Sequence, residues 1–325
     1  MTKEIDGPID PISHVHPQLR AFVEPIQRMI GPPGLDLEIL AARRKLVYGK
    51  PPAAQPAWIE RIVPGAAGDP DVRVYVVNAA RPGAGKPAIL HIHGGGFVMR
   101  DAASAISHVQ ELAHDLDCVI VTVDYRLAPE TPYPGALNDN YAALKWLHVN
   151  AEALGADASR IALMGDSAGG GHAAMLAIAA RDRGETPLIY QALLYPMLDD
   201  RTGSTREAPR RHGQIVWTPQ ENRFCWTALL GVEAGSDDVP AGAVPARVED
   251  LRDLPPTFIG VGGIDLFVDE DIEYARRLIA AGVPTELIVV PGAFHGFDGL
   301  VQADVVRRFN TAFMAALRSA LSAGA

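Results

Sequence analysis

Ser167 is the residue whose surroundings most clearly suggest chemistry, because it stands in the run GDSAG at residues 165–169. The apolar residues 161–164 predict a strand before it, and residues 168–181 predict a helix after it. A serine in a glycine-flanked turn between a strand and a helix projects its hydroxyl from a sharp bend, where it can act as a nucleophile. The alternative interpretation of this run is a tight turn that serves packing alone. The position of the run between a strand and a helix favours a nucleophilic serine over a packing turn.

A serine hydroxyl is a weak nucleophile near neutral pH, so it needs a histidine as a base. Of the ten histidines, only His295 lies beyond the last predicted strand, residues 287–290, at an edge where catalytic groups collect. We expect His212 to be solvated, because it stands in a charged run, and His172 to pack inside, on the helix after the serine. His295 is therefore the predicted base.

The histidine in turn needs a carboxylate that fixes its tautomer. Asp265 directly follows the predicted strand at residues 258–261. Asp269 and Glu270 lie one helical turn later, where a helix predicted over residues 270–281 begins and where the helix dipole favours carboxylates. We therefore predict that Asp265 orients His295, in the chain order serine, aspartate, histidine.

Three glycines at residues 94–96 follow the predicted strand at residues 88–93. They leave backbone N–H groups able to approach a ligand oxygen, as an oxyanion hole requires, and the N–H of Ala168 would add another donor. A phosphate loop is disfavoured, because the chain lacks the corresponding glycine-lysine pattern here. His91 and His93 are expected to be packed or hydrogen-bonded, since no acid or cysteine stands nearby at metal-ligand spacing.

The elements that must position these residues alternate between helix and strand along most of the chain. This alternation predicts an α/β protein with a parallel sheet covered on both faces. Strands are predicted at residues 72–76, 88–93, 118–124, 161–164, 189–195, 258–261 and 287–290, with helices at 18–29, 35–46, 104–116, 137–154, 168–181, 219–230 and 270–281. Between residues 196 and 254 the regular alternation lapses, which indicates an insertion above the carboxyl edge of the sheet.

Composition excludes several classes of function. The formal net charge of −10, from 39 acidic and 29 basic residues without long runs, argues against nucleic acid or an anionic membrane as a partner. No apolar stretch approaches a membrane span, and the first thirty residues lack the pattern of a secretory leader, so we expect an unprocessed cytoplasmic protein. Cys118 and Cys225 form no disulfide framework or zinc spacing, and we expect neither metal nor cofactor.

Four motifs together resemble the hormone-sensitive lipase family of esterases: HGGGF at residues 93–97, DYRLAPE at 124–130, GDSAGG at 165–170 and HGF at 295–297. The resemblance implies the α/β-hydrolase fold, with a mostly parallel eight-stranded sheet flanked by helices. It implies a catalytic triad of Ser167, Asp265 and His295. It also implies an oxyanion hole formed by the N–H groups of Gly95, Gly96 and Ala168, with the part of Gly94 left open.

The resemblance further implies a helical cap over the acyl pocket. The cap would comprise residues 1–55 and 196–254, and the catalytic core residues 56–195 and 255–325. Arg126 is expected to pair with Glu130 in a structural loop beside the site. A homodimer is an expectation at the level of the family.

These observations predict a serine carboxylesterase that hydrolyses small-molecule esters with short to medium acyl chains through an acyl-enzyme on Ser167. Two alternatives stay open. Amide or carbamate hydrolysis uses the same triad, and a binding protein could keep this fold without catalysis. The presence of His295 argues against the binding protein, because such proteins typically lose the histidine.

Overall fold

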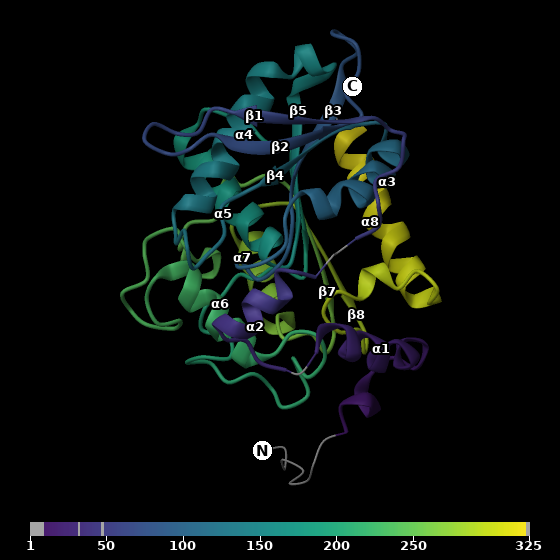
Figure 1. Cartoon of the computed structure of the whole chain (residues 1–325), viewed down its shortest axis with the longest axis vertical. Helices are drawn as coiled ribbons and strands as arrows, with labels where there is room; N and C mark the ends of the chain where they lie inside the picture. Colours follow the sequence, from purple (N-terminus) through teal and green to yellow (C-terminus); the bar gives the residue numbers. More distant parts are fainter. Residues whose placement is uncertain (1–9, 32, 47–48, 323–325) are drawn as a thin grey trace.

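A computed structural model describes residues 10–31, 33–46 and 49–322 of the chain. Part of residues 1–55, the predicted N-terminal part of the cap, therefore lies outside the described residues. Eight strands form one sheet in the order β1-β2-β4-β3-β5-β6-β7-β8 (Figure 1). The strands are β1 (Trp58–Val63), β2 (Val72–Val77), β3 (Lys86–Ile92), β4 (Val119–Asp124), β5 (Ala156–Asp166), β6 (Tyr190–Leu194), β7 (Thr257–Gly262) and β8 (Thr285–Val290). Only the pairings of β1 with β2 and of β2 with β4 are antiparallel, which confirms the mostly parallel sheet.

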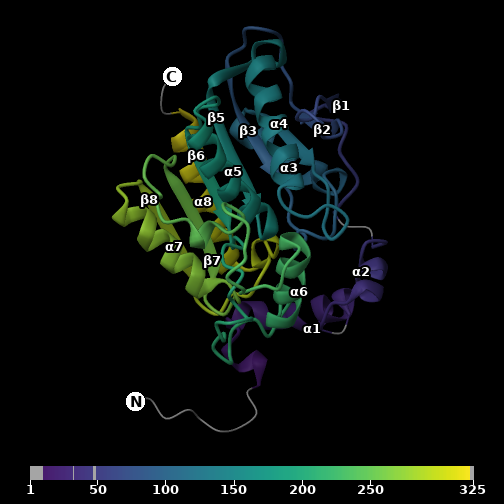
Figure 2. The same ribbon diagram turned by 90° about the vertical axis from the view of Figure 1, so that its left-hand side faces the viewer.

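The sheet separates two hydrophobic cores, because successive side chains of a strand point to opposite faces. Leu90, Ile92 and Val121 belong to one core, and Ile89 and Ile120 belong to the other. The first core is covered by α4 (Gly135–Asn150), α5 (Ala168–Arg183) and α7 (Val268–Ala280), and the second by α3 (Ile106–Leu116) and α8 (Asp304–Ser322). In Figure 2 the yellow helix α8 passes behind the strands. Helices thus cover both faces, as predicted.

Three further helices gather at one end of the molecule: α1 (Arg20–Ile30), α2 (Leu37–Arg43) and α6 (Pro219–Leu230), as both ribbon views show. A buried ion pair of 2.8 Å between Arg43 Nη1 and Glu221 Oε1 joins α2 to α6. Thr218 begins α6 with a capping box that also uses Glu221. Short 3₁₀ turns complete the fold at Pro11–His14, Pro17–Leu19, Ala103–Ala105, Glu152–Leu154, Pro245–Arg247 and Phe297–Gly299.

The expected pairing of Arg126 with Glu130 is wrong. The Arg126 guanidinium binds Asp139 at 2.7 Å and Asp69 at 2.9 Å. Glu130 instead pairs with Arg44, which comes from the segment after α2. Closeness in sequence does not make the two charges partners, because each side chain pairs with residues of other segments of the fold.

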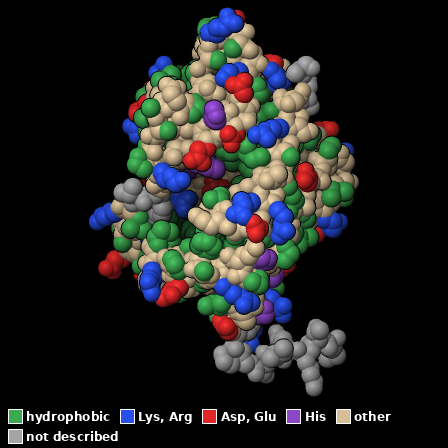
Figure 3. Space-filling model, turned by 90° about the vertical axis from the view of Figure 1, so that its right-hand side faces the viewer, with side chains coloured by type: hydrophobic (Ala, Val, Ile, Leu, Met, Phe, Trp, Pro, Cys, Tyr) green, Lys and Arg blue, Asp and Glu red, His purple; other side chains and the backbone are tan. Residues whose placement is uncertain are grey.

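The surface shown in Figure 3 carries Lys, Arg, Asp and Glu side chains intermingled with hydrophobic ones, without a field of a single sign. Within the described ranges, none of the helices combines the length and the apolar character that crossing a membrane would require.

Candidate active site

Ser167 lies at the bend between β5 and α5, with φ of 55° and ψ of −120°. Positive φ is uncommon for a residue with a side chain, and such strain is maintained only where the surroundings enforce it. Two backbone hydrogen bonds do so: the N–H of Ser167 donates to Leu194 O at 2.8 Å, and the N–H of Met197 donates to Ser167 O at 3.0 Å. The chain therefore presents the serine hydroxyl on a rigid turn.

The two glycines of the predicted motif are required by close backbone contacts. A Cβ on Gly165 would lie 2.2 Å from Gly169 O, and a Cβ on Gly169 would lie 2.0 Å from Ile92 O. The second contact joins the turn at Ser167 to the end of β3, where the glycine cluster begins. Glycine at position 165 is thus required for the turn itself, and glycine at position 169 for its close approach to the end of β3.

The three residues predicted as a triad are joined by hydrogen bonds. His295 Nε2 lies 2.9 Å from Ser167 Oγ, and His295 Nδ1 lies 2.9 Å from Asp265 Oδ2. The other carboxylate oxygen of Asp265 accepts the N–H of Phe267 at 3.1 Å. An N–H at Nδ1 directed at the carboxylate leaves Nε2 free to accept the serine proton. The arrangement can therefore activate the hydroxyl as a nucleophile.

Aromatic rings enclose the imidazole of His295. Tyr195, Phe267 and Trp217 lie with ring centroids 4.7, 5.2 and 6.0 Å from it. Ser167 and His295 are each only 6% exposed. Burial raises the pKa of Tyr195 well above its ordinary value, and the nearby Asp298 carboxylate raises it further. Charge that develops at the serine is therefore poorly screened by water.

The glycine cluster lies beside Ser167, because β3 and β5 are neighbours and Ile92 pairs with Gly165. Gly95 and Gly96 have φ of 126° and 62°, which favour glycine. The N–H groups of Gly95, Gly96 and Ala168 donate to no protein acceptor within the part of the chain that the structure describes. These N–H groups can therefore serve a ligand oxygen. Gly94 is kept small for another reason: a Cβ there would lie 2.5 Å from Asp166 Oδ2.

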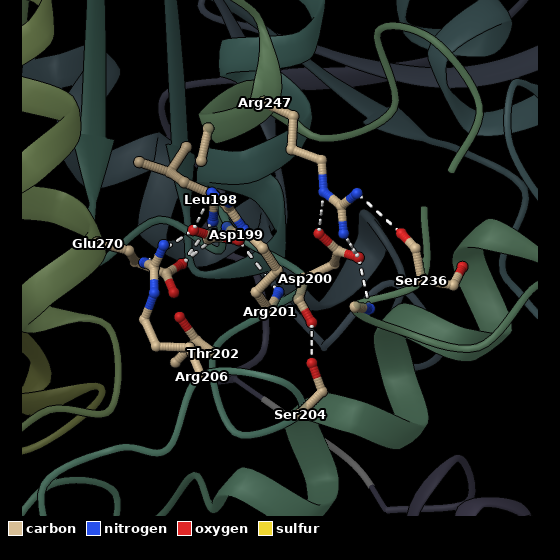
Figure 4. A network of polar contacts seen from close by, with 12 residues as sticks. Leu198, Asp199, Asp200, Arg201, Thr202, Ser204, Arg206, Ser236, Arg247 and Glu270 are labelled. Carbon is tan, nitrogen blue, oxygen red and sulfur yellow. Dashed lines mark hydrogen bonds and ion pairs between the residues drawn. The ribbon is translucent and has the colours of Figure 1, made fainter. Parts of the chain in front are cut away.

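A polar network that the sequence did not reveal holds the segment after β6 in place (Figure 4). Glu270 Oε1 accepts the backbone N–H groups of Leu198 and Asp199 at 2.7 and 3.1 Å. Because the N–H of Met197 donates to the backbone oxygen of Ser167, these contacts link α7 to the turn at Ser167. Burial, and secondarily the Asp199 carboxylate, raises the pKa of Glu270 well above its ordinary value.

The same network includes Asp199 and Asp200 as acceptors for three arginines. Asp199 pairs with Arg201 and Arg206, at 2.8 and 2.9 Å. Asp200 pairs with Arg247 at 2.8 Å. Glu270 was predicted only as an acid favoured by the helix dipole, and no feature of the local sequence indicates that its carboxyl turns inward to another segment.

The remaining histidines lie mostly as expected. His91 Nδ1 is 2.9 Å from Thr122 Oγ1 and His93 Nδ1 is 2.8 Å from Gly94 O, while burial lowers the pKa of His91 and of His172 to about 3. The expectation for His212 is wrong: its side chain is only 12% exposed, and burial lowers its pKa. Among the described residues no cluster of three or more His, Cys, Asp or Glu side chains is arranged to hold a metal.

Comparisons with known proteins agree with this geometry. A family model described as the alpha/beta hydrolase fold matches residues 89–299. Esterase LipI of Mycobacterium tuberculosis is 38% identical over 246 residues, which cover 74% of this chain and 75% of that protein. Carboxylesterase NlhH of the same species is 36% identical over 269 residues, covering 80% and 82%.

Among solved structures, a bacterial heroin esterase is similar with a TM-score of 0.83 and 36% identity, over 96% of this chain and 99% of that one. The predicted resemblance to the hormone-sensitive lipase family is thereby confirmed, and the chain belongs to the α/β-hydrolase fold family.

Proposed function

We propose that the protein is a serine carboxylesterase that hydrolyses esters with short to medium acyl chains through an acyl-enzyme on Ser167. The observation that carries the proposal is the hydrogen-bonded chain from Ser167 through His295 to Asp265. The names of relatives as esterases and carboxylesterases support the same reaction class. The reaction uses groups of the chain itself at each step.

In the first half of the reaction, Ser167 Oγ attacks the ester carbonyl carbon while His295 Nε2 takes its proton. The carbonyl oxygen becomes an oxyanion, which the N–H groups of Gly95, Gly96 and Ala168 stabilise. The carbon–oxygen bond to the alcohol then breaks, and His295 gives the proton to the leaving oxygen. An alcohol departs and the acyl group remains on the serine.

In the second half, water attacks the acyl carbon while His295 takes one of its protons. A second oxyanion forms in the same hole, and the bond to Ser167 breaks as the histidine returns the proton to the serine oxygen. The carboxylic acid leaves. Asp265 keeps the imidazole in the required tautomer and stabilises its charged form in both halves.

The preference for short to medium acyl chains is inferred from the enclosure of the site. Ser167 and His295 are almost completely covered, and aromatic rings surround the imidazole. We further propose that residues 1–55 and 196–254 act as the cap, with residues 56–195 and 255–325 as the core. The buried ion pair between Arg43 and Glu221, which joins the two parts of this cap, supports the division.

The proposal is tested by the variant Ser167→Ala, assayed on p-nitrophenyl butyrate and on ethyl butyrate. We expect turnover to fall about 10⁶-fold, because without the hydroxyl no acyl-enzyme forms. Ser319→Ala, at an exposed position of α8, is the matched control and should keep full activity. Hydrolysis by the Ser167 variant at more than a hundredth of the wild-type rate would overturn the assignment.

A further inference from the structure

The indole of Trp217 lies next to both the glycine cluster and His295. We infer that Trp217 is a specificity-determining residue: it forms a fixed wall between the glycine cluster and His295 and limits the length of those chains. The inference rests on the proposed function and adds the residue that sets substrate size. Trp217 lies in the segment after β6, outside the regular elements of the core.

The ring contacts both sides of the site. A Cβ on Gly96 would lie 2.5 Å from Cη2 and 3.1 Å from Cζ2 of Trp217, so the edge of the indole rests on the glycine cluster. The centroid of the ring is 6.0 Å from that of His295, with 34° between the planes. The carbonyl group of a bound ester must lie between the N–H of Gly96 and Nε2 of His295. The indole therefore borders the space for the groups attached to that carbonyl.

Contacts from behind fix the indole in this position. Its Nε1–H donates to Asn222 Oδ1 at 3.3 Å, and Asn222 Nδ2 donates to Thr202 O at 2.8 Å. Asn222 is completely buried, and Trp217 is only 6% exposed. A ring anchored at its nitrogen through a buried amide cannot swing aside without leaving polar groups unpaired. The wall formed by the indole is therefore rigid.

The backbone before the tryptophan carries strain. Val216 has φ of 70°, in the left-handed region that a β-branched side chain strongly disfavours. Such residues cluster at sites where the surroundings enforce one conformation for a functional reason. Here the strained residue directly precedes Trp217, whose indole lies against Gly96. This observation is independent of the ring contacts and leads to the same residue.

Removing the indole should open space for additional methylene groups next to the carbonyl carbon. Each methylene that becomes buried should raise kcat/KM about fourfold, from the free energy of transfer of a methylene group. Two series of substrates distinguish the two sides of the ester bond: p-nitrophenyl esters from acetate to dodecanoate, and acetates of alcohols from ethanol to octanol.

The experiment compares wild type, Trp217→Ala and Trp217→Leu with Trp58→Ala as the matched control. Trp58 lies on the edge strand β1 and is 38% exposed, so its loss should leave the dependence of kcat/KM on chain length unchanged. We expect both Trp217 variants to raise the ratio of kcat/KM for long over short chains at least tenfold in one of the two series. Trp217→Leu keeps the test valid if the alanine variant fails to fold.

The inference would be overturned if kcat/KM depended on chain length in the Trp217 variants as it does in wild type, in both series. That result would leave the proposed function intact. A wild-type protein that hydrolyses no ester of either series would overturn the proposed function, and the inference with it. The two failures are therefore distinguishable in one set of assays.

Discussion

Replacing Asp265 by asparagine should disable the site without changing its shape. In the native protein Oδ1 accepts the N–H of Phe267 at 3.1 Å and Oδ2 faces His295 Nδ1 at 2.9 Å. An asparagine must keep its oxygen toward Phe267, because that buried N–H needs an acceptor. Its NH₂ group then faces Nδ1, which becomes an acceptor, so the imidazole carries its proton on Nε2.

An Nε2–H donates toward Ser167 Oγ and cannot take the proton of the hydroxyl. The expected loss is about 10⁴-fold in kcat, as when the tautomer of a serine-protease histidine is reversed in the same way. This corresponds to about 5.4 kcal/mol at about 1.36 kcal/mol per factor of ten. KM should change little, because the substitution leaves the pocket unaltered in size.

The assay measures kcat and KM for p-nitrophenyl butyrate, with far-ultraviolet circular dichroism to verify folding. Asp269→Asn is the matched control, because Asp269 lies one turn later with a side chain that is 59% exposed. It should keep wild-type activity. A kcat for the Asp265 variant within tenfold of wild type would refute the reasoning, as would an equal loss in the control.

Two further predictions concern stability. The pKa of Glu270 is raised by burial, so its contribution to stability is fully present below the unfolded value of about 4.3 and is lost as pH rises through the folded pKa. Glu270→Gln keeps an acceptor and stays neutral, so urea unfolding should show it gaining stability relative to wild type from pH 4 to pH 8. A variant that lost stability relative to wild type over this pH range would contradict the raised pKa of Glu270. Trp226→Ala should lower the free energy of unfolding by about 3–5 kcal/mol, because a fully buried ring against Phe97 leaves a cavity. A loss below about 1 kcal/mol in the same experiment would mean that the ring is not packed as described.

The parts of the fold with a strong local signal could be predicted from the sequence. Buried parallel strands appear in the sequence as short apolar runs. The residues that follow such strands, such as Ser167 and Asp265, lie at one edge because the strands of the sheet are parallel. Strand β1 was missed because it is an antiparallel edge strand, exposed at five of its six positions, without alternation in its sequence. Helix α8 was also missed, although Phe309, Phe313 and Leu317 recur every four residues and carried the signal.

The contacts between distant segments could not be predicted. Nothing near Glu270 indicates that it binds the backbone of residues 198 and 199, and nothing near Trp217 indicates that its ring reaches Gly96. Such contacts depend on how the segment after β6 folds back over the sheet. That path follows from long-range packing, which leaves no period or motif in the sequence.

Covalent trapping tests the central claim most directly. The protein is incubated with a fluorophosphonate, digested and analysed by mass spectrometry, with His295→Ala treated in parallel. We predict one phosphonyl group per chain, attached to Ser167. We also predict that this label forms far more slowly in the histidine variant. A label on another residue, or equal rates of labelling in the two proteins, would contradict activation of this serine by that histidine.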